Sequence, residues 1–173
     1  MNFRSIFGLV GQFILLLSVQ VLLLKNLALF GVAFCFIYLL AILLLPISIR
    51  TIPLMIIAFF MGLSVDIFYE TIGMHAAAAT LLAFLRNFWL KTVSPSGGYD
   101  EGSIPSIRSQ SMSWFITYSF PLFFAFSMLL FSVDFWGTGN WLNVLNKSFF
   151  SSIFTLILAI IVQLLFFPRR RVI

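Results

Sequence analysis

The sequence predicts an all-α integral membrane protein with six transmembrane helices and both termini on the cytoplasmic side. The chain of 173 residues is 62% hydrophobic and only 9% charged, with a mean hydropathy of +1.13, whereas a soluble domain carries about 25% charged residues. Six apolar stretches approach the roughly 20 residues that a helix needs to span a bilayer, and basic residues collect at alternate ends of these stretches. Length and composition indicate a single transmembrane domain over residues 1–173.

The expected helices are similar in length and are separated by one long polar connection. The sequence predicts them at residues 6–24, 32–49, 52–68, 73–90, 114–131 and 149–167. Residues 91–111 are rich in Ser and Gly and carry charges of both signs, which predicts a flexible cytoplasmic loop. This loop is either a plain linker or a contact site for a cytoplasmic protein.

Most basic residues fall on one side of the membrane if the N-terminus lies in the cytoplasm. Lys25 and Lys147 are then outside, and the other eight are inside: Arg4, Arg50, Arg86, Lys91, Arg108 and Arg169–Arg171. The positive-inside rule therefore predicts that both termini are cytoplasmic. We expect Arg86 to reach the inner interface. The basic tail is expected to contact anionic membrane lipid. The orientation of the chain in the membrane explains the net charge of +5, so no nucleic-acid partner is expected.

The helices expected at 52–68 and 73–90 form a polar hairpin in the middle of the chain. It holds two acids, the single histidine and one arginine, and its marked positions are Gly62, Asp66, Gly73, His75 and Arg86. The short connection requires antiparallel helices, and Gly73 can form the turn. A carboxylate beside hydrocarbon needs a partner, so we expect Asp66 to latch the turn through His75 or through the N–H groups of Gly73 and Met74. The latch is structural, or it contacts a partner or ligand directly.

The first expected helix carries small residues on one face. These are Gly8, Gly11 and Ser18. Small residues let another helix approach closely. This face either packs inside the bundle or docks the transmembrane helix of a partner.

Sequence motifs for catalysis and for cofactor binding are missing. The chain has no Gly-rich phosphate loop, no Walker pattern and no Cys/His metal spacing. His75 is the one base-like candidate, and nothing in the sequence puts a serine beside it. We therefore expect no catalytic, cofactor or metal site. Two functions remain open: an assembly subunit that binds other membrane proteins, and a small-molecule-binding subunit of a transporter.

The polar hairpin resembles the signature of a family of bacterial membrane proteins. The stretch Phe60-Met61-Gly62-Leu63-Ser64-Val65-Asp66, then Gly73-Met74-His75-Ala76, then Arg86, looks like the core signature of the rod shape-determining protein MreD family. In that family a glycine-rich helix ends in an acid, a Gly-x-His follows a short turn, and a basic residue closes the next helix. The length, the six expected helices and the basic tail agree, so the resemblance covers essentially the whole chain. The Phe-rich composition, the turn at residues 68–71 and the loop after Lys91 depart from the family pattern.

This resemblance implies a subunit of the bacterial cell-elongation (rod) complex in the inner, cytoplasmic membrane. Family members pair with the bitopic protein MreC, and through it they connect the actin-like MreB to a peptidoglycan polymerase and transpeptidase, which controls cell shape. Their fold is similar to that of the substrate-binding subunits of energy-coupling-factor vitamin transporters. The alternative is therefore a vitamin-binding transporter subunit. Its outer-facing cavity would use Asp66, Glu70, His75 and Trp136 or Trp141.

Overall fold

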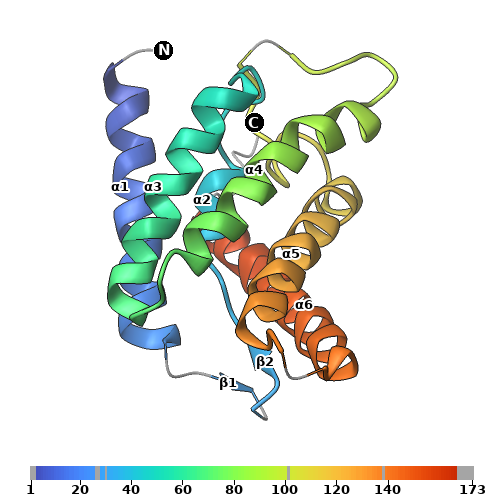
Figure 1. Cartoon of the computed structure of the whole chain (residues 1–173). Helices are drawn as coiled ribbons and strands as arrows, with labels where there is room; N and C mark the ends of the chain where they lie inside the picture. Colours follow the sequence, from blue (N-terminus) through green and yellow to red (C-terminus); the bar gives the residue numbers. More distant parts are fainter. Residues whose placement is uncertain (1–2, 26–27, 30, 101, 138, 167–173) are drawn as a thin grey trace.

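The computed structural model describes residues 3–25, 28–29, 31–100, 102–137 and 139–166. Within these ranges the chain is mostly helical, and a two-stranded antiparallel hairpin lies at one end (Figure 1). The long helices are α1 (Phe3–Val19), α3 (Thr51–Tyr69), α4 (Met74–Thr92), α5 (Met112–Asp134) and α6 (Trp141–Phe166). The short elements are the π-helix η1 (Gln20–Leu24), the strands β1 (Ala28–Leu29) and β2 (Ala33–Phe34), and α2 (Leu39–Leu43).

Helix α4 joins the two halves of the bundle. It packs against α3 on one side and against α5 on the other, and α5 packs against α6 (Figure 1). The short helix α2 lies in the middle and contacts both α1 and α4. The hydrophobic core is centred on this middle segment, because every residue from Cys35 to Leu45 is buried.

Three helices, α3, α5 and α6, are long and apolar enough to cross a membrane. This agrees with the membrane-protein character that the composition predicts. Described basic residues separate toward the two ends of the bundle: Arg50 and Lys91 line one cavity where α3 begins and α4 ends, whereas Lys25 donates to the carbonyl of Phe68 at the opposite end of α3. The orientation across the membrane stays a prediction from this charge pattern.

The prediction of a helix at residues 32–49 is wrong. The chain enters this region as strand β2, stays non-helical through residues 35 and 36, and then forms only the five-residue helix α2 before it turns away. Non-helical backbone at membrane depth is tolerated where it is buried inside protein. The uniformly apolar run in this region cannot distinguish a buried helix from another buried conformation.

Two hydroxyl groups on α6 explain why the extended conformation is stable here. The N–H group of Phe34 donates to Ser151 Oγ at 2.9 Å, and that of Phe36 donates to Thr155 Oγ1 at 3.0 Å. Four helical residues rise about 6 Å, and two residues of extended chain span roughly 6.6 Å. The spacing of the two hydroxyls therefore matches alternate N–H groups of an extended segment.

The other expected helices are present with shifted ends. Helix α6 begins at Trp141, eight residues before the expected start at 149, and the end predicted at Phe167 lies outside the described residues. The first helix changes to a π-helix at Gln20. Helices α3, α4 and α5 begin and end within three residues of the expected positions.

The connection between α4 and α5 makes defined contacts with the bundle. Its described residues form neither helix nor strand. The Tyr99 hydroxyl donates to the carbonyl of Leu90 at 2.9 Å, and the N–H group of Ile107 donates to Gln163 Oε1 at 2.9 Å. The flexibility expected for residues 91–111 stays a prediction. The two hydrogen bonds attach this connection to α4 and to α6.

We predict that Thr155→Val destabilises the bundle although it keeps the side-chain shape. The substitution leaves the buried N–H group of Phe36 without its acceptor, and an unsatisfied buried donor costs about 1–3 kcal/mol. The free energy of unfolding in mixed micelles measures this cost. Thr80→Val is the matched control, because the Thr80 hydroxyl bonds only the carbonyl of Ala76 in its own helix. Equal unfolding free energies for the two variants would contradict the role assigned to Thr155.

Candidate functional site

Helices α3 and α4 meet backbone to backbone at Gly62. A Cβ atom at this position would lie 2.6 Å from the Cα atom of Ala76 and 2.6 Å from the carbonyl oxygen of His75. No side chain fits at that distance, so only glycine allows this crossing. Ala78, Ala79 and the neighbouring small residues of α4 are also buried. The glycine of the predicted signature is therefore a packing requirement of the hairpin.

The turn between the two helices uses two residues in the left-handed region. Glu70 ends α3 with φ of 58°, and Gly73 precedes α4 with φ of 73°. This agrees with the predicted role of Gly73, since glycine adopts positive φ without strain. Glu70 leaves the helical path. Its side chain is therefore exposed, whereas that of Asp66 is buried.

Asp66 reaches across the turn and binds the first residues of α4. Its carboxylate accepts hydrogen bonds from the N–H groups of His75 at 3.0 Å and Ala76 at 2.9 Å, and from the Thr71 hydroxyl at 2.5 Å. The expected donors, Gly73 N–H, Met74 N–H and the His75 side chain, are not the ones used. N–H groups in the first turn of a helix have no internal partner, and the helix dipole favours a negative charge there. A buried carboxylate is thus compensated without a cation.

The imidazole of His75 is enclosed by aromatic rings. Ring centroids of Phe36, Tyr38, Tyr69 and Phe126 lie 5.2–6.1 Å from its own, and Tyr38 Oη lies 3.3 Å from Nδ1. The side chain is only 3% exposed. His75 therefore fills the core between α4, α5 and the middle segment, and it is closed to a ligand from outside.

Gln20 forms a buried polar contact next to these aromatic rings, and the sequence analysis did not identify it. Its Nε2 atom donates to the carbonyl of Cys35 at 2.8 Å and to Tyr69 Oη at 2.7 Å. Gln20 is fully buried, and the contact joins η1 to the non-helical segment and to the end of α3. A glutamine within the apolar residues 19–24 was the available signal, because a buried N–H group needs an acceptor.

The expectation that Arg86 reaches the inner interface is wrong. Its side chain is fully buried. Nε donates to Tyr118 Oη at 2.9 Å, and one terminal nitrogen donates to the carbonyls of Leu43 and Leu45. The Tyr118 hydroxyl in turn donates to the Leu43 carbonyl at 3.1 Å. The guanidinium thus satisfies carbonyl groups at the end of α2.

The position of Arg86 follows from the interrupted middle segment. A helix end leaves carbonyl groups without an internal partner, and such groups are costly when buried. The side chain makes no ion pair with any carboxylate among the described residues. Carbonyl dipoles and a tyrosine hydroxyl therefore stabilise the cation. A continuous helix at 32–49 would leave no free carbonyl group at residues 43 and 45. With that helix assumed, the sequence predicts that Arg86 reaches the membrane interface.

The small-residue face of α1 is not packed inside the bundle. Gly8, Gly11 and Ser18 are all exposed. A Cβ atom added at Gly8 or Gly11 would meet no heavy atom within 4 Å. The Ser18 hydroxyl bonds the carbonyl of Ile14 in its own helix. Of the two explanations for this face, internal packing is therefore excluded for these residues.

The residues named for an outer ligand cavity do not come together. Trp136 and Trp141 line a cavity of about 140 Å³ that includes neither Asp66 nor His75. Ligand pockets for small molecules usually have volumes of roughly 300–1,000 Å³. Asp66 and His75 are buried in a separate polar core. Comparison with protein-family models, with curated proteins and with solved structures finds no match to this chain.

We predict that Asp66→Leu destabilises the hairpin more than Asp66→Asn. Leucine leaves the N–H groups of His75 and Ala76 without an acceptor, at a cost of about 1–3 kcal/mol each. Asparagine keeps one acceptor oxygen. Folded yield and unfolding temperature in detergent measure the difference. Glu70→Gln, at an exposed acid of the same turn, should lie within about 0.5 kcal/mol of wild type; wild-type behaviour of Asp66→Leu would contradict the latch.

We predict that Arg86→Met lowers the free energy of unfolding although the substitution makes the side chain apolar. The Leu45 carbonyl loses its donor, and an unsatisfied buried acceptor costs about 1–3 kcal/mol. Arg108→Gln, at an exposed arginine, is the control and should change stability by less than about 0.5 kcal/mol. If Arg86→Met unfolds like this control, the guanidinium is not required to hold the middle segment.

Proposed function

We propose that this chain is a non-enzymatic membrane subunit of the bacterial cell-elongation complex that pairs with MreC. In this role it helps to couple the MreB cytoskeleton to peptidoglycan synthesis by the elongation polymerase and transpeptidase. The observation that carries the proposal is that the marked residues Gly62, Asp66 and Arg86 of the MreD-like signature are buried and that each makes a structural contact within the bundle. Gly62 sets the helix crossing, Asp66 caps α4, and Arg86 holds the middle segment.

The distribution of polar groups supports a role in assembly. Asp66 and His75 contact other parts of the chain and are closed to solvent. General acid–base or nucleophilic catalysis needs such a group within reach of a substrate. We therefore propose that the buried hairpin provides a rigid scaffold and that function resides on the outer faces of the helices.

The exposed face of α1 is the proposed contact for the transmembrane helix of MreC. Gly8, Gly11 and Ser18 present little side-chain volume, and small residues let two membrane helices approach closely. Their neighbours Ile14 and Leu15 are large, apolar and exposed. A single helix from a bitopic partner can cover such a face.

The vitamin-binding alternative has weaker support. It requires polar groups that converge on an outer cavity. The acid and histidine named for it are buried and bonded within the hairpin, and the cavity beside Trp136 and Trp141 is small. We propose localisation in the inner membrane with both termini in the cytoplasm, which places Arg50 and Lys91 on the inner side.

We predict that Gly11→Leu weakens recovery of MreC without unfolding the protein. A Cβ atom at this position meets no neighbouring atom within 4 Å, so the larger side chain is accommodated in the isolated chain. It would block close approach by a second helix. Co-purification from cells that express both proteins measures recovery, and size-exclusion chromatography of the variant measures folding.

Thr117→Leu is the matched control for this experiment. Thr117 is exposed on α5, and its side chain bonds only the carbonyl of Ser113 in the same helix. MreC recovery should stay at the wild-type level for this variant. Failure of the wild-type chain to recover MreC would refute the proposed function, whereas normal recovery with Gly11→Leu would refute the α1 contact alone.

A further inference from the structure

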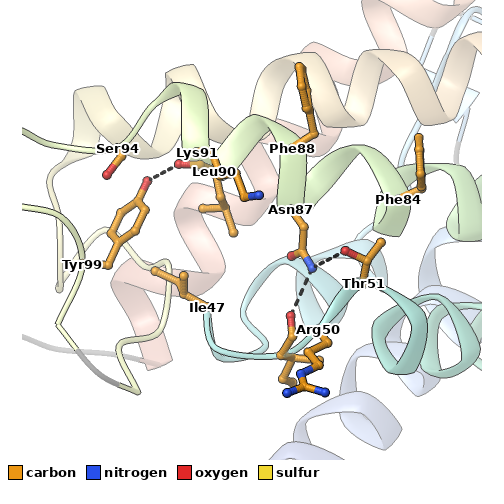
Figure 2. Close-up of a pocket in the computed structure, with 11 residues that line it drawn as sticks. Ile47, Arg50, Thr51, Phe84, Asn87, Phe88, Leu90, Lys91, Ser94 and Tyr99 are labelled. Carbon is orange, nitrogen blue, oxygen red and sulfur yellow. Dashed lines mark hydrogen bonds between the residues drawn. The ribbon is translucent and has the colours of Figure 1, made fainter.

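A cavity of about 700 Å³ lies where α3 begins and α4 ends (Figure 2). We call it the α3–α4 cavity. Asn87 holds its walls together, because Nδ2 donates to the carbonyl of Ile49 and to Thr51 Oγ1, both at 3.1 Å. Tyr99 closes another side through its hydrogen bond to the carbonyl of Leu90. The cavity is thus built from α4, the start of α3 and the α4–α5 connection.

The charged residues of this cavity are both cations. Arg50 stands directly before α3, Lys91 lies in the last turn of α4, and both side chains are exposed. Among the residues that the structure describes, no acidic side chain lines the cavity, and neither cation has a hydrogen-bonding or ion-pair partner. In contrast, Lys25 donates to the Phe68 carbonyl at 2.6 Å, and Lys147 lies 4.4 Å from the ring centroid of Phe135. Within the described part of the chain, both cations of the α3–α4 cavity therefore lack a direct partner.

The surface beside these cations is apolar and strongly exposed. Phe84 is 53% exposed and Phe88 is 70% exposed, and Figure 2 shows the two rings pointing the same way from α4. Residues 84, 88 and 91 follow one another at helical spacing. One stripe of α4 therefore changes from aromatic to cationic toward the end of the helix. This arrangement is complementary to an amphiphile with an anionic headgroup and an apolar tail.

We propose that the α3–α4 cavity binds an anionic phospholipid, with its phosphate at Arg50 and Lys91 and its acyl chains against Phe84 and Phe88. Basic pockets between membrane helices bind anionic headgroups on the cytoplasmic side. The carbonyl of Leu90 near the end of α4, which would repel an anion, already accepts the Tyr99 hydroxyl. The site lies apart from the small-residue face of α1, and it does not depend on the proposed pairing with MreC.

An acidic segment of a cytoplasmic protein could also meet the two cations. The aromatic stripe favours lipid, because Phe88 and Phe84 lie about one and two turns, respectively, farther from the helix end than Lys91. An acyl chain extends from its phosphate in that direction. A soluble acidic segment would leave this apolar surface uncovered.

Native mass spectrometry of the purified full-length protein tests the proposal. The protein is exchanged into detergent with phosphatidylglycerol or phosphatidylcholine of identical acyl chains, and bound lipid is counted. We expect wild type to retain phosphatidylglycerol in preference to phosphatidylcholine. The double variant Arg50→Gln/Lys91→Gln should retain phosphatidylglycerol about 30-fold more weakly, the effect of two basic residues at an anionic surface.

Two controls distinguish this site from general charge attraction and from a phosphate site. Arg108→Gln removes an exposed cation outside the α3–α4 cavity, and it should leave retention unchanged. Phe88→Ser should reduce retention while both cations remain. Equal losses for Arg108→Gln and the double variant would overturn the proposal, as would full retention in the double variant.

Competition with soluble anions separates lipid from the other occupants. Inorganic phosphate or glycerol phosphate at millimolar concentration should not displace bound phosphatidylglycerol, because neither covers the aromatic stripe. Displacement by these ions would reduce the site to a phosphate site and overturn the lipid assignment. Displacement by an acidic peptide, with no effect of Phe88→Ser, would assign the cavity to a cytoplasmic protein instead.

Discussion

The backbone polar groups of the interrupted middle segment are the constraint on which this structure depends. Residues 35–45 run through the core of the bundle with only five of them in α2. Buried N–H and carbonyl groups outside a helix need partners from elsewhere. Ser151 and Thr155 of α6 supply acceptors at one end, and Arg86 of α4 supplies donors at the other. Two helices are thereby fixed to a segment that could not be stable alone.

Helix α4 carries the second set of constraints. The N–H groups of its first turn donate to the Asp66 carboxylate, and the backbone of the same turn packs against Gly62. Arg86 lies in the second half of the helix. The acid and the arginine act separately, each on backbone groups. This arrangement places two charges in an apolar interior without an ion pair between them, because unpaired groups at helix ends provide the compensation.

Both surfaces to which we assign recognition lie on the outside of the molecule. The small-residue face of α1 and the α3–α4 cavity lie on different elements and have different chemistry. The first is apolar and permits close approach, as a membrane helix requires. The second combines two exposed cations with exposed aromatic rings, as an anionic lipid requires. The proposed assembly role would use both surfaces at the same time.

The amino-acid sequence was sufficient to predict helices apolar enough to cross a membrane, the tight turn at Gly73, and the bounds of the five long helices to within a few residues, if α1 is counted together with η1 and except at the start of α6. These follow from hydropathy, helix length and backbone freedom, which are local properties. Tertiary structure alone decided the conformation of residues 32–49, the partners of Asp66 and Arg86, and the exposure of Gly8 and Gly11. A uniformly apolar stretch carries no periodicity that separates helix from extended chain. Its conformation depends on hydroxyl groups more than 100 residues away, and Arg86 is buried because that conformation leaves carbonyl groups to be satisfied.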